Sequence, residues 1–325
     1  MKNKFLITGG SGFLGQWLVR KLLEFYPASS IISISRNPSS QQFVNDPRVD
    51  WRYCRDIRDS SISKDFLGVD VVIHSAAYCS LFRKDQNELI DINRDGTKNI
   101  LNICKKQDIK RVIYIGSTAM IGGSKDGTLR DEFFVDRKNN LKKPYSYSKQ
   151  LAQEVVDEFS GIIPIISVLP GMILGSWDFG NTSKLVNTVK NFSMICPPGG
   201  TSVIDIRDVV DAIVYLFEKG ACGEKYIVSN QNLSYFEITS VIAKRLDKNP
   251  PKWIVPSVFE HLPMRLIEFC LGKLSPISYE QFLNAFLYRY FSNDKIKKLG
   301  WSAKYDLDDS LDLFFDWKKE SAEDC

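Results

Sequence analysis

Tyr145 and Lys149 form the residue pair in this chain whose types and spacing suggest chemistry. Residues four apart lie on one face of a helix, so the phenol and the ammonium are expected side by side. A free phenol has a pKa of about 10 and is a slow acid or base at neutral pH, whereas a nearby cation stabilises its phenolate. The pair therefore predicts a proton-transfer site, although the same spacing also occurs on helices where both side chains only pack.

A glycine-rich loop supplies a second chemical element. Gly9, Gly12 and Gly15 follow an expected strand at residues 5–8 and open an expected helix at residues 13–25. Glycines let the backbone approach a pyrophosphate, and the N–H groups and dipole of the following helix attract its negative charge. The spacing is G-x-x-G-x-x-G, and its place between a strand and a helix predicts a dinucleotide-binding loop. A tight turn without a ligand is the alternative interpretation.

Arg36 bears on which dinucleotide is bound. It stands at the end of the expected second strand, about twenty residues after the loop, where an NAD site places an acidic residue for the ribose 2′-hydroxyl. No acid is found there, and the planar guanidinium of Arg36 suits a 2′-phosphate. The sequence therefore favours NADP as the cofactor, with NAD possible, and a solvent-facing arginine is the alternative interpretation.

The elements that would position these residues alternate along the first half of the chain. Short β-branched runs followed by helical periodicity are typical of βαβ units and a parallel sheet. The expected strands lie at residues 5–8, 31–35, 71–74, 111–115 and 162–169, and two more at 203–206 and 225–228 are expected to rejoin the sheet. The helix that carries Tyr145 is expected to run to about Phe159. We predict an α/β fold, a Rossmann doubly wound parallel sheet with a smaller, mostly helical C-terminal substrate lobe.

The alternation of strands and helices becomes irregular after Pro170, and this change predicts two interlocked domains. Residues 1–170 with about 203–232 are expected to form the dinucleotide-binding Rossmann domain. Residues from about 171–202 with 233–325 are expected to form the substrate-binding lobe, which is rich in aromatic residues. The side chains that would line a pocket there are Trp177, Phe179, Phe192, Met194, Trp253, Phe259 and Met264.

Composition argues against several classes of function. The net charge is only +4 and lysines are scattered among acids, so nucleic-acid binding has no electrostatic support. Seven cysteines without a C-x-x-C pair and only two histidines argue against a disulfide framework or a metal site. The uncharged stretch 159–177 is interrupted by prolines and glycines, so a buried strand explains it better than a membrane span. No export signal is visible, and the cytoplasm is the expected location.

Further motifs follow the glycine loop in a defined order. Residues 54–57 (C-R-D-I) are similar to a G-D-[LI] adenine-binding element, residues 72–77 to a V-x-H-x-A-A strand end, and residues 93–99 to an N-x-x-G-T-x-N helix. Tyr145 and Lys149 then match a Y-x-x-x-K pair. Over nearly its whole length the chain therefore resembles the extended short-chain dehydrogenase/reductase family, within the NAD-dependent epimerase/dehydratase superfamily.

The resemblance implies a catalytic triad and a cofactor site. Tyr145 would give or take the proton of the reacting oxygen, and Lys149 would hold the nicotinamide ribose and lower the pKa of Tyr145. Thr118 would hydrogen-bond the reacting oxygen, with Ser117 as a close second candidate. The family also implies a homodimer and no metal. The implied cofactor-binding residues are Gly9, Gly12, Phe13, Leu14, Arg36, Asp56, Ile57, Ala76, Ala77, Tyr145, Lys149 and Pro170.

Local residues distinguish activities within this family. Dehydratases carry an Asp-Glu pair after the catalytic Thr, whereas Ala119 and Met120 stand here, which disfavours dehydration. The D-I-R-D-V run at residues 205–209 resembles the reductase branch that includes dihydroflavonol-reductase-like and 3β-hydroxysteroid-dehydrogenase-like enzymes. The expected function is NADP(H)-dependent reduction of a ketone or aldehyde, or oxidation of the alcohol, on a medium-sized, partly apolar small-molecule substrate. The alternatives are a nucleotide-sugar epimerase with bound NAD and a non-catalytic dinucleotide-sensing protein.

Overall fold

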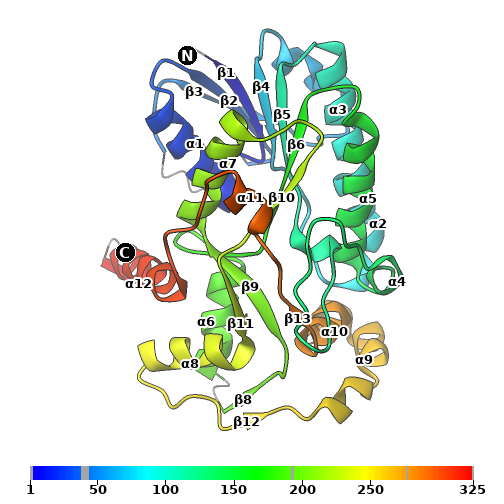
Figure 1. The fold of residues 1–325 in the computed structure, drawn as a ribbon, viewed down its shortest axis with the longest axis vertical. Coiled ribbons are helices and arrows are strands. Elements are labelled where there is room, and N and C mark those ends of the chain that lie inside the picture. Colours follow the sequence, from blue (N-terminus) through cyan, green and yellow to red (C-terminus); the bar gives the residue numbers. More distant parts are fainter. Residues whose placement is uncertain (1–2, 38–43, 192–193, 276, 324–325) are drawn as a thin grey trace.

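Seven parallel strands form the central sheet of the computed structural model, which describes residues 3–37, 44–191, 194–275 and 277–323 (Figure 1). The order is β10-β6-β5-β4-β1-β2-β3. The strands are β1 (Lys4–Thr8), β2 (Ser30–Ser35), β3 (Val49–Tyr53), β4 (Val71–His74), β5 (Arg111–Ile115), β6 (Ile165–Pro170) and β10 (Lys225–Val228). The chain leaves β1 on one side through β2 and β3 and continues on the other through β4. In such sheets the crevice at the carboxyl ends of the two diverging strands holds the ligand.

Helices cover both faces of this sheet, as predicted (Figure 1). Phe5 and Ile7 of β1 pack in one core with α1 and α7, and Leu6 packs in the opposite core with α3 and α5. The periodicity of two along a strand buried on both sides explains this division. These helices are α1 (Phe13–Phe25), α2 (Gln86–Ile90), α3 (Gly96–Lys106), α5 (Pro144–Phe159) and α7 (Ile206–Lys219). The shorter turns between them are η1 (Ser60–Phe66), η2 (Arg83–Asp85), the π-helical turn η3 (Asp91–Asp95), η4 (Thr118–Met120) and α4 (Arg137–Asn140).

A second, smaller sheet corrects one expectation. The strand expected at residues 203–206 exists as β9 (Gly200–Asp205), but it pairs with β7, β11 and β13 and does not join the central sheet. A fully buried apolar run looks the same in either sheet, because pairing partners are set by distant segments. The elements of this layer are β7 (Met172–Leu174), β11 (Gln231–Ser234), β13 (Tyr288–Arg289), α6 (Asn181–Asn191), α8 (Tyr235–Arg245) and α12 (Leu307–Glu323). The division of the chain into two domains stays a prediction.

The far end of the C-terminal part is built from short elements. Figure 1 shows β8, β12 and α9 along the edge of the molecule furthest from the amino end of the central sheet. These and the following elements are β8 (Ile195–Cys196), β12 (Trp253–Ile254), η5 (Ser257–His261), α9 (Met264–Leu271), η6 (Gly272–Leu274), α10 (Tyr279–Ala285) and α11 (Asp294–Lys298).

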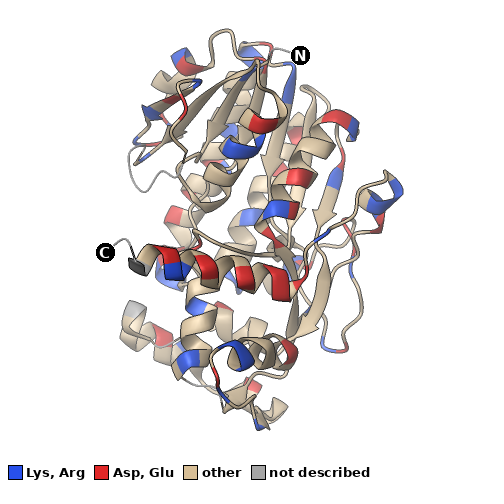
Figure 2. Ribbon diagram, turned by 90° about the vertical axis from the view of Figure 1, so that its left-hand side faces the viewer, with Lys and Arg blue, Asp and Glu red and all other residues tan. Residues whose placement is uncertain are grey.

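Charged residues of both signs are interspersed over the ribbon, and several positions along α12 are acidic (Figure 2). Two of these, Asp308 and Asp312, pair with Arg245 of α8 at 2.6 and 3.0 Å, so part of the acidic surface ties two helices together. Among the described residues, no helix is both long and apolar enough to cross a bilayer.

Candidate active site

The glycine loop lies against the carboxyl end of β4. Gly9 has a φ of +75°, and a β-carbon there would lie 2.9 Å from the backbone of Ala76. A β-carbon on Gly15 would collide with the carbonyl oxygen of Gly9. Only glycine fits both positions. At Gly9 the positive φ and the nearby backbone of Ala76 exclude a side chain, and at Gly15 the backbone of Gly9 and Gly10 leaves no space for one. The loop is therefore shaped to bring backbone, not side chains, to the crevice beside β1 and β4.

The N-terminus of α1 opens toward this loop without a side-chain cap. Gly12 is the N-cap residue, no side chain accepts from the first turn, and no acidic residue lies in that turn. The first N–H groups of a helix lack partners within the helix and, together with the dipole, attract an anion. Phe13 and Leu14, two of the residues predicted to bind the cofactor, stand in this turn. The residues present therefore suit the pyrophosphate of a dinucleotide.

A buried chain of hydrogen bonds fixes the strand end that faces the loop. The amide of Ala76 donates to Thr8 Oγ1 (3.1 Å), and the Thr8 hydroxyl lies 2.7 Å from Nδ1 of His74. Nε2 of His74 lies 3.0 Å from the Thr97 hydroxyl, which donates to the Asn93 carbonyl. These partners require the Nε2–H tautomer. Burial lowers the pKa of His74 to about 3, so the ring is neutral and structural.

The predicted adenine-binding element is held by a neighbouring helix. Asn99 Nδ2 donates to the carbonyl of Ile57 (2.8 Å), and the Ile57 side chain fills the space beside Gly96. Asp56 forms an ion pair with Arg58 at 2.6 Å. Arg36 directly follows β2 and is exposed.

Tyr145 and Lys149, the predicted catalytic pair, lie on α5, which begins with Pro144 at its first turn and ends at Phe159 as predicted. The side chains of Ser117 and Cys79 are hydrogen-bond neighbours of the Tyr145 phenol, and the Ser117 contact lowers the pKa of the phenol whereas the Cys79 contact raises it. Thr118 instead buries its hydroxyl in a bond to the Pro170 carbonyl (3.1 Å). The geometry therefore favours Ser117, the second candidate, as the partner of Tyr145.

The protonation of this pair differs from the expectation. Burial, more than any other cause, raises the pKa of Tyr145 well above its usual range, and the neighbouring Cys79 raises it further. Burial lowers the pKa of Lys149, whose ammonium donates to the Ile115 carbonyl at 3.4 Å. The expected lowering of the Tyr145 pKa by Lys149 is not seen. The phenol is thus held protonated at neutral pH.

Cys79 was missed by the sequence analysis. Its position beside Tyr145 is set by Asn93, whose side chain bonds both the amide (2.7 Å) and the carbonyl (3.0 Å) of Tyr78. Asn93 also donates to Ser148 of α5 (2.9 Å) and stands in the π-helical turn η3. Such turns often occur at functional sites. The N-x-x-G-T-x-N motif predicted a helix at residues 93–99 but gave no indication of the Cys79 thiol.

Glu280 was also missed. This carboxylate on α10 accepts from the amides of Tyr145 (2.8 Å) and Ser146 (3.1 Å) and from the Ser146 hydroxyl (2.7 Å). Glu280 therefore caps the N-terminus of the helix that carries the phenol, from a segment 135 residues away. Lys143, the N-cap residue, is buried beside it.

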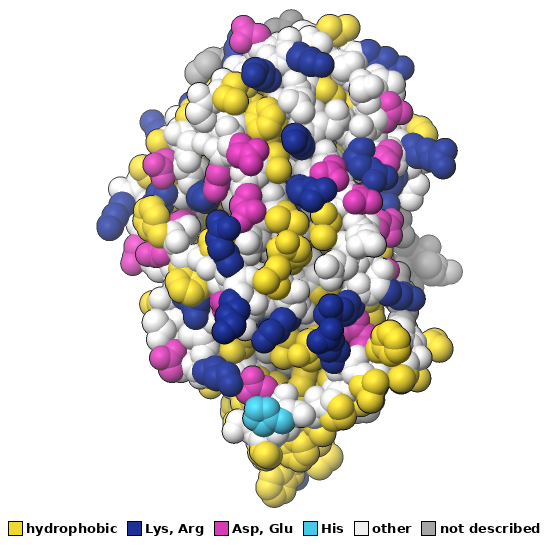
Figure 3. Space-filling model, turned by 90° about the vertical axis from the view of Figure 1, so that its right-hand side faces the viewer, with side chains coloured by type: hydrophobic (Ala, Val, Ile, Leu, Met, Phe, Trp, Pro, Cys, Tyr) yellow, Lys and Arg dark blue, Asp and Glu magenta, His cyan; other side chains and the backbone are white. Residues whose placement is uncertain are grey.

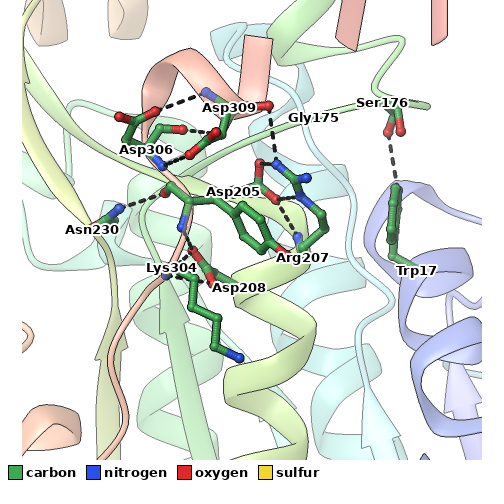
Figure 4. Close-up of polar contacts among 12 residues, drawn as sticks. Trp17, Gly175, Ser176, Asp205, Arg207, Asp208, Asn230, Lys304, Asp306 and Asp309 are labelled. Carbon is green, nitrogen blue, oxygen red and sulfur yellow. Dashed lines mark hydrogen bonds and ion pairs between the residues drawn. The ribbon is translucent and has the colours of Figure 1, made fainter. Parts of the chain in front are cut away.

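The D-I-R-D-V run is structural, as Figure 4 shows. Arg207 is paired with Asp205 at 2.8 Å, donates to the Asp309 carbonyl and lies 3.6 Å over the Tyr305 ring. Asp208 accepts from the amides of Lys304 and Tyr305, each at 3.0 Å. The guanidinium is therefore engaged in joining α7 to the C-terminal segment.

The residues expected to line a pocket are dispersed. Trp177 and Phe179 pack on Trp317 of α12, with ring centroids 5.8 and 5.1 Å apart. Met264 is buried in a small cluster with two phenylalanines. Met194, Trp253 and Phe259 are exposed at the far end of the C-terminal part, and Phe192 lies outside the described residues.

Comparison with known proteins agrees with this geometry. Residues 5–229 match the model of the NAD dependent epimerase/dehydratase family. The chain is 31% identical over 265 residues to a putative dihydroflavonol 4-reductase of Synechocystis, covering 79% of this chain and 76% of that protein. It is 26% identical over 348 residues to an anthocyanidin reductase of Vitis vinifera, covering 96% and 94%. The crystal structure of Thermus thermophilus UDP-glucose 4-epimerase in complex with NAD has the same fold, with a TM-score of 0.75 at 18% identity over 97% of this chain and 99% of that one.

Proposed function

The chain belongs to the NAD-dependent epimerase/dehydratase family and is a nicotinamide-dinucleotide-dependent enzyme, and from this premise we propose that it reduces a ketone or aldehyde with NADPH. The observation that carries the proposal is the protonated phenol of Tyr145 in hydrogen-bond contact with the Ser117 hydroxyl. A reductase needs a proton donor at the carbonyl oxygen, and a phenol, whose ordinary pKa is about 10, carries that proton at neutral pH.

A reduced nicotinamide dinucleotide held in this site would supply the hydride for the carbonyl carbon. Tyr145 donates its phenolic proton to the carbonyl oxygen, and Ser117 donates a hydrogen bond to the same oxygen as negative charge develops. Lys149, buried behind Tyr145, would hold the nicotinamide ribose. The backbone of Gly12 and Phe13 would hold the pyrophosphate. The protein thus orients the substrate oxygen between two hydroxyls.

NADP preference is the second part of the proposal. Arg36 is exposed directly after β2 and is the cation best placed to meet a 2′-phosphate. Arg36→Ala is expected to raise the KM for NADPH at least about tenfold, the loss of one charge-assisted contact, while the KM for NADH stays the same. Arg265→Ala, at an exposed arginine far from the crevice, is the matched control. Equal loss for both cofactors would contradict the role given to Arg36.

The experiment that tests the activity is a panel of ketones and aldehydes with NADPH, followed by absorbance of the reduced nicotinamide. Tyr145→Phe is expected to lower kcat at least about 100-fold, the usual contribution of a positioned acid. No NADPH oxidation with any substrate would overturn the reductase proposal. Dinucleotide that survives purification, together with inversion of a UDP-sugar, would indicate the epimerase instead. Intact biological activity in Tyr145→Phe would indicate a dinucleotide sensor.

A further inference from the structure

An exposed apolar surface covers the far end of the C-terminal part. We call residues 194–195, 253–275 and 277 the lobe tip. It holds more than half of the large hydrophobic side chains exposed in the described part of the chain. Phe269 and Leu274 are 86% and 87% exposed, and Trp253 is 67% exposed. Scattered exposed hydrophobics are ordinary, but a contiguous apolar surface of this kind marks a place where the protein meets something apolar.

The lobe tip is built to present this surface outward. In α9 only Met264 and Glu268 face inward, while Leu266, Ile267 and Phe269 face solvent. The short pair β8–β12 continues the surface through Trp253 and Ile254. Figure 1 shows these elements in line along one edge of the molecule, and Figure 3 shows hydrophobic side chains gathered at that end. The surface lies at an end of the molecule, where a flat partner can reach it.

The charged residues around the lobe tip indicate what kind of surface it could bind. Its acids are engaged within the protein, since Glu260 pairs with Lys125 at 2.8 Å and Glu268 accepts from the amides of Arg83 and Tyr279. The exposed cations Lys84, Lys252 and Arg265 form no ion pair within the described residues. Figure 3 shows further Lys and Arg side chains across the face above the apolar end. Apolar side chains rimmed by unpaired cations complement an anionic lipid surface.

We propose that the lobe tip docks this enzyme on the surface of an anionic lipid bilayer, with the exposed side chains of α9 and β12 inserted at the boundary between headgroups and acyl chains. The molecule lies on the bilayer and does not cross it. The docking does not depend on the proposed reductase activity.

The position of the lobe tip gives this docking a consequence for substrate access. Glu268 of α9 accepts from the Arg83 amide at 2.6 Å. The loop before Arg83 carries Cys79, the thiol that contacts Tyr145. The docking surface therefore borders the segment that enters the catalytic site, so a partly apolar carbonyl substrate would reach Tyr145 from the bilayer. This consequence, unlike the docking itself, rests on the proposed function.

Vesicle flotation with the full-length protein tests the docking. We expect binding to vesicles of phosphatidylcholine mixed with phosphatidylglycerol, at least about fivefold tighter than to phosphatidylcholine alone and weakened by salt, as one or more cations near an anionic surface would give. The double variant Phe269→Ser with Leu274→Ser is expected to lose this binding. Phe133→Ser is the matched control, because Phe133 is 83% exposed on a loop outside the lobe tip.

A fluorescence experiment tests the docking without removing the apolar side chains of α9. Bilayer lipids with brominated acyl chains are expected to quench the fluorescence of Trp253, and Trp253→Phe is expected to remove that quenching. NADPH turnover of a water-soluble carbonyl is expected to be the same in the double variant and the wild type. Docking without any NADPH oxidation would leave this proposal standing while overturning the reductase.

Three results would overturn the docking. One is the absence of binding to anionic vesicles, and another is equal vesicle binding by the double variant and the wild type. The third is self-association of the wild type without lipid that the double variant abolishes, since the lobe tip would then join two copies of this chain.

Discussion

Burial and two neighbouring side chains set the acid–base character of Tyr145. Burial raises its pKa, the Cys79 thiol raises it further, and the contact with the Ser117 hydroxyl opposes both. Lys149 is itself buried and donates to a backbone carbonyl, so it is not the main influence on the pKa of Tyr145. The phenol and the neighbouring Ser117 hydroxyl together offer two hydrogen-bond donors to a substrate oxygen.

Ser117 and Thr118 are expected to have different roles, which substitution of each residue can distinguish. Ser117→Ala is expected to lower kcat about 100-fold, because the developing oxyanion loses one of its two donors. Thr118→Ala is expected to leave kcat within about threefold but to lower the free energy of unfolding by about 1–3 kcal/mol, because the Pro170 carbonyl loses a buried partner. Steady-state kinetics and urea unfolding on both variants check this. The reverse assignment would hold if Thr118→Ala showed the larger kinetic loss.

At the scale of the element, α5 is placed by a charge from another part of the chain. Helix N-termini leave amides without partners, and an anion there is stabilised by the dipole. Glu280 provides that anion and accepts from two amides and a hydroxyl at the turn that contains Tyr145. Any rotation or slip of α5 would break these bonds. Glu280 is therefore a positioning residue for the phenol.

Glu280→Gln tests this positioning. The glutamine amide has one acceptor oxygen where the carboxylate has two, so one donor of α5 loses its partner and the helix start is expected to shift. We expect kcat to fall about tenfold or more with an unchanged KM for NADPH, and the free energy of unfolding to fall by about 1–3 kcal/mol. Glu237→Gln, in the exposed capping box of α8, is the control and is expected to leave kcat unchanged. A kcat equal to wild type in Glu280→Gln would refute the positioning role.

Lys143, the N-cap residue of α5, predicts a dependence of stability on pH. Burial, with Arg289 adding to it, lowers the pKa of Lys143 from 10.5 to about 8. Below pH 8 the lysine is charged in both the folded and the unfolded state, and the folded state bears the cost of the buried charge. Between about pH 8 and pH 10.5 the folded lysine loses its proton first, so this cost disappears and stability contributed by this group rises with pH.

Lys143→Met is therefore expected to be more stable than the wild type at pH 7, by about 2–3 kcal/mol, and to lose this advantage by about pH 10. Urea unfolding at both pH values measures it. Lys142→Met, at the exposed neighbouring position, is expected to show no difference at either pH. An advantage of Lys143→Met that stayed constant with pH would mean that methionine gains by packing and not by removing a buried charge.

Sequence reasoning succeeded where the information is local. The helix of Tyr145, the glycine loop and six strands of the central sheet follow from periodicities of a few residues and from turn residues, whereas the edge strand β3 was not predicted. It failed where partners are distant: β9 has the apolar run of any buried strand, and nothing near Tyr145 indicates Glu280. The choice between Ser117 and Thr118 depended on which hydroxyl the local backbone turns toward Pro170, a feature that adjacent residues of similar type do not reveal.

At the scale of the whole molecule, the chain passes between its two sheets at the end of β9. Asp205 ends that strand and caps α7, accepting from the Arg207 amide at 2.7 Å. Helix α7 packs on the central sheet, whereas α12 packs on β9. The segment around Lys304 therefore joins the two layers (Figure 4). The proposed catalytic residues of one layer keep their distance from the other layer only if this joint is rigid.

Asp208 is the buried centre of that joint, and its removal is the prediction that belongs to the whole molecule. In Asp208→Ala the amides of Lys304 and Tyr305 lose a charged acceptor, which is expected to cost about 2–4 kcal/mol of unfolding free energy. Amide hydrogen exchange is expected to accelerate throughout α12 before it does so in α5, because the C-terminal segment detaches first. Asp316→Ala, on the exposed side of α12, removes only a surface ion pair with Lys319 and is expected to cost at most about 0.5 kcal/mol. Uniform acceleration of exchange in both helices would show that the two layers unfold as one unit and that Asp208 does not act as a local joint.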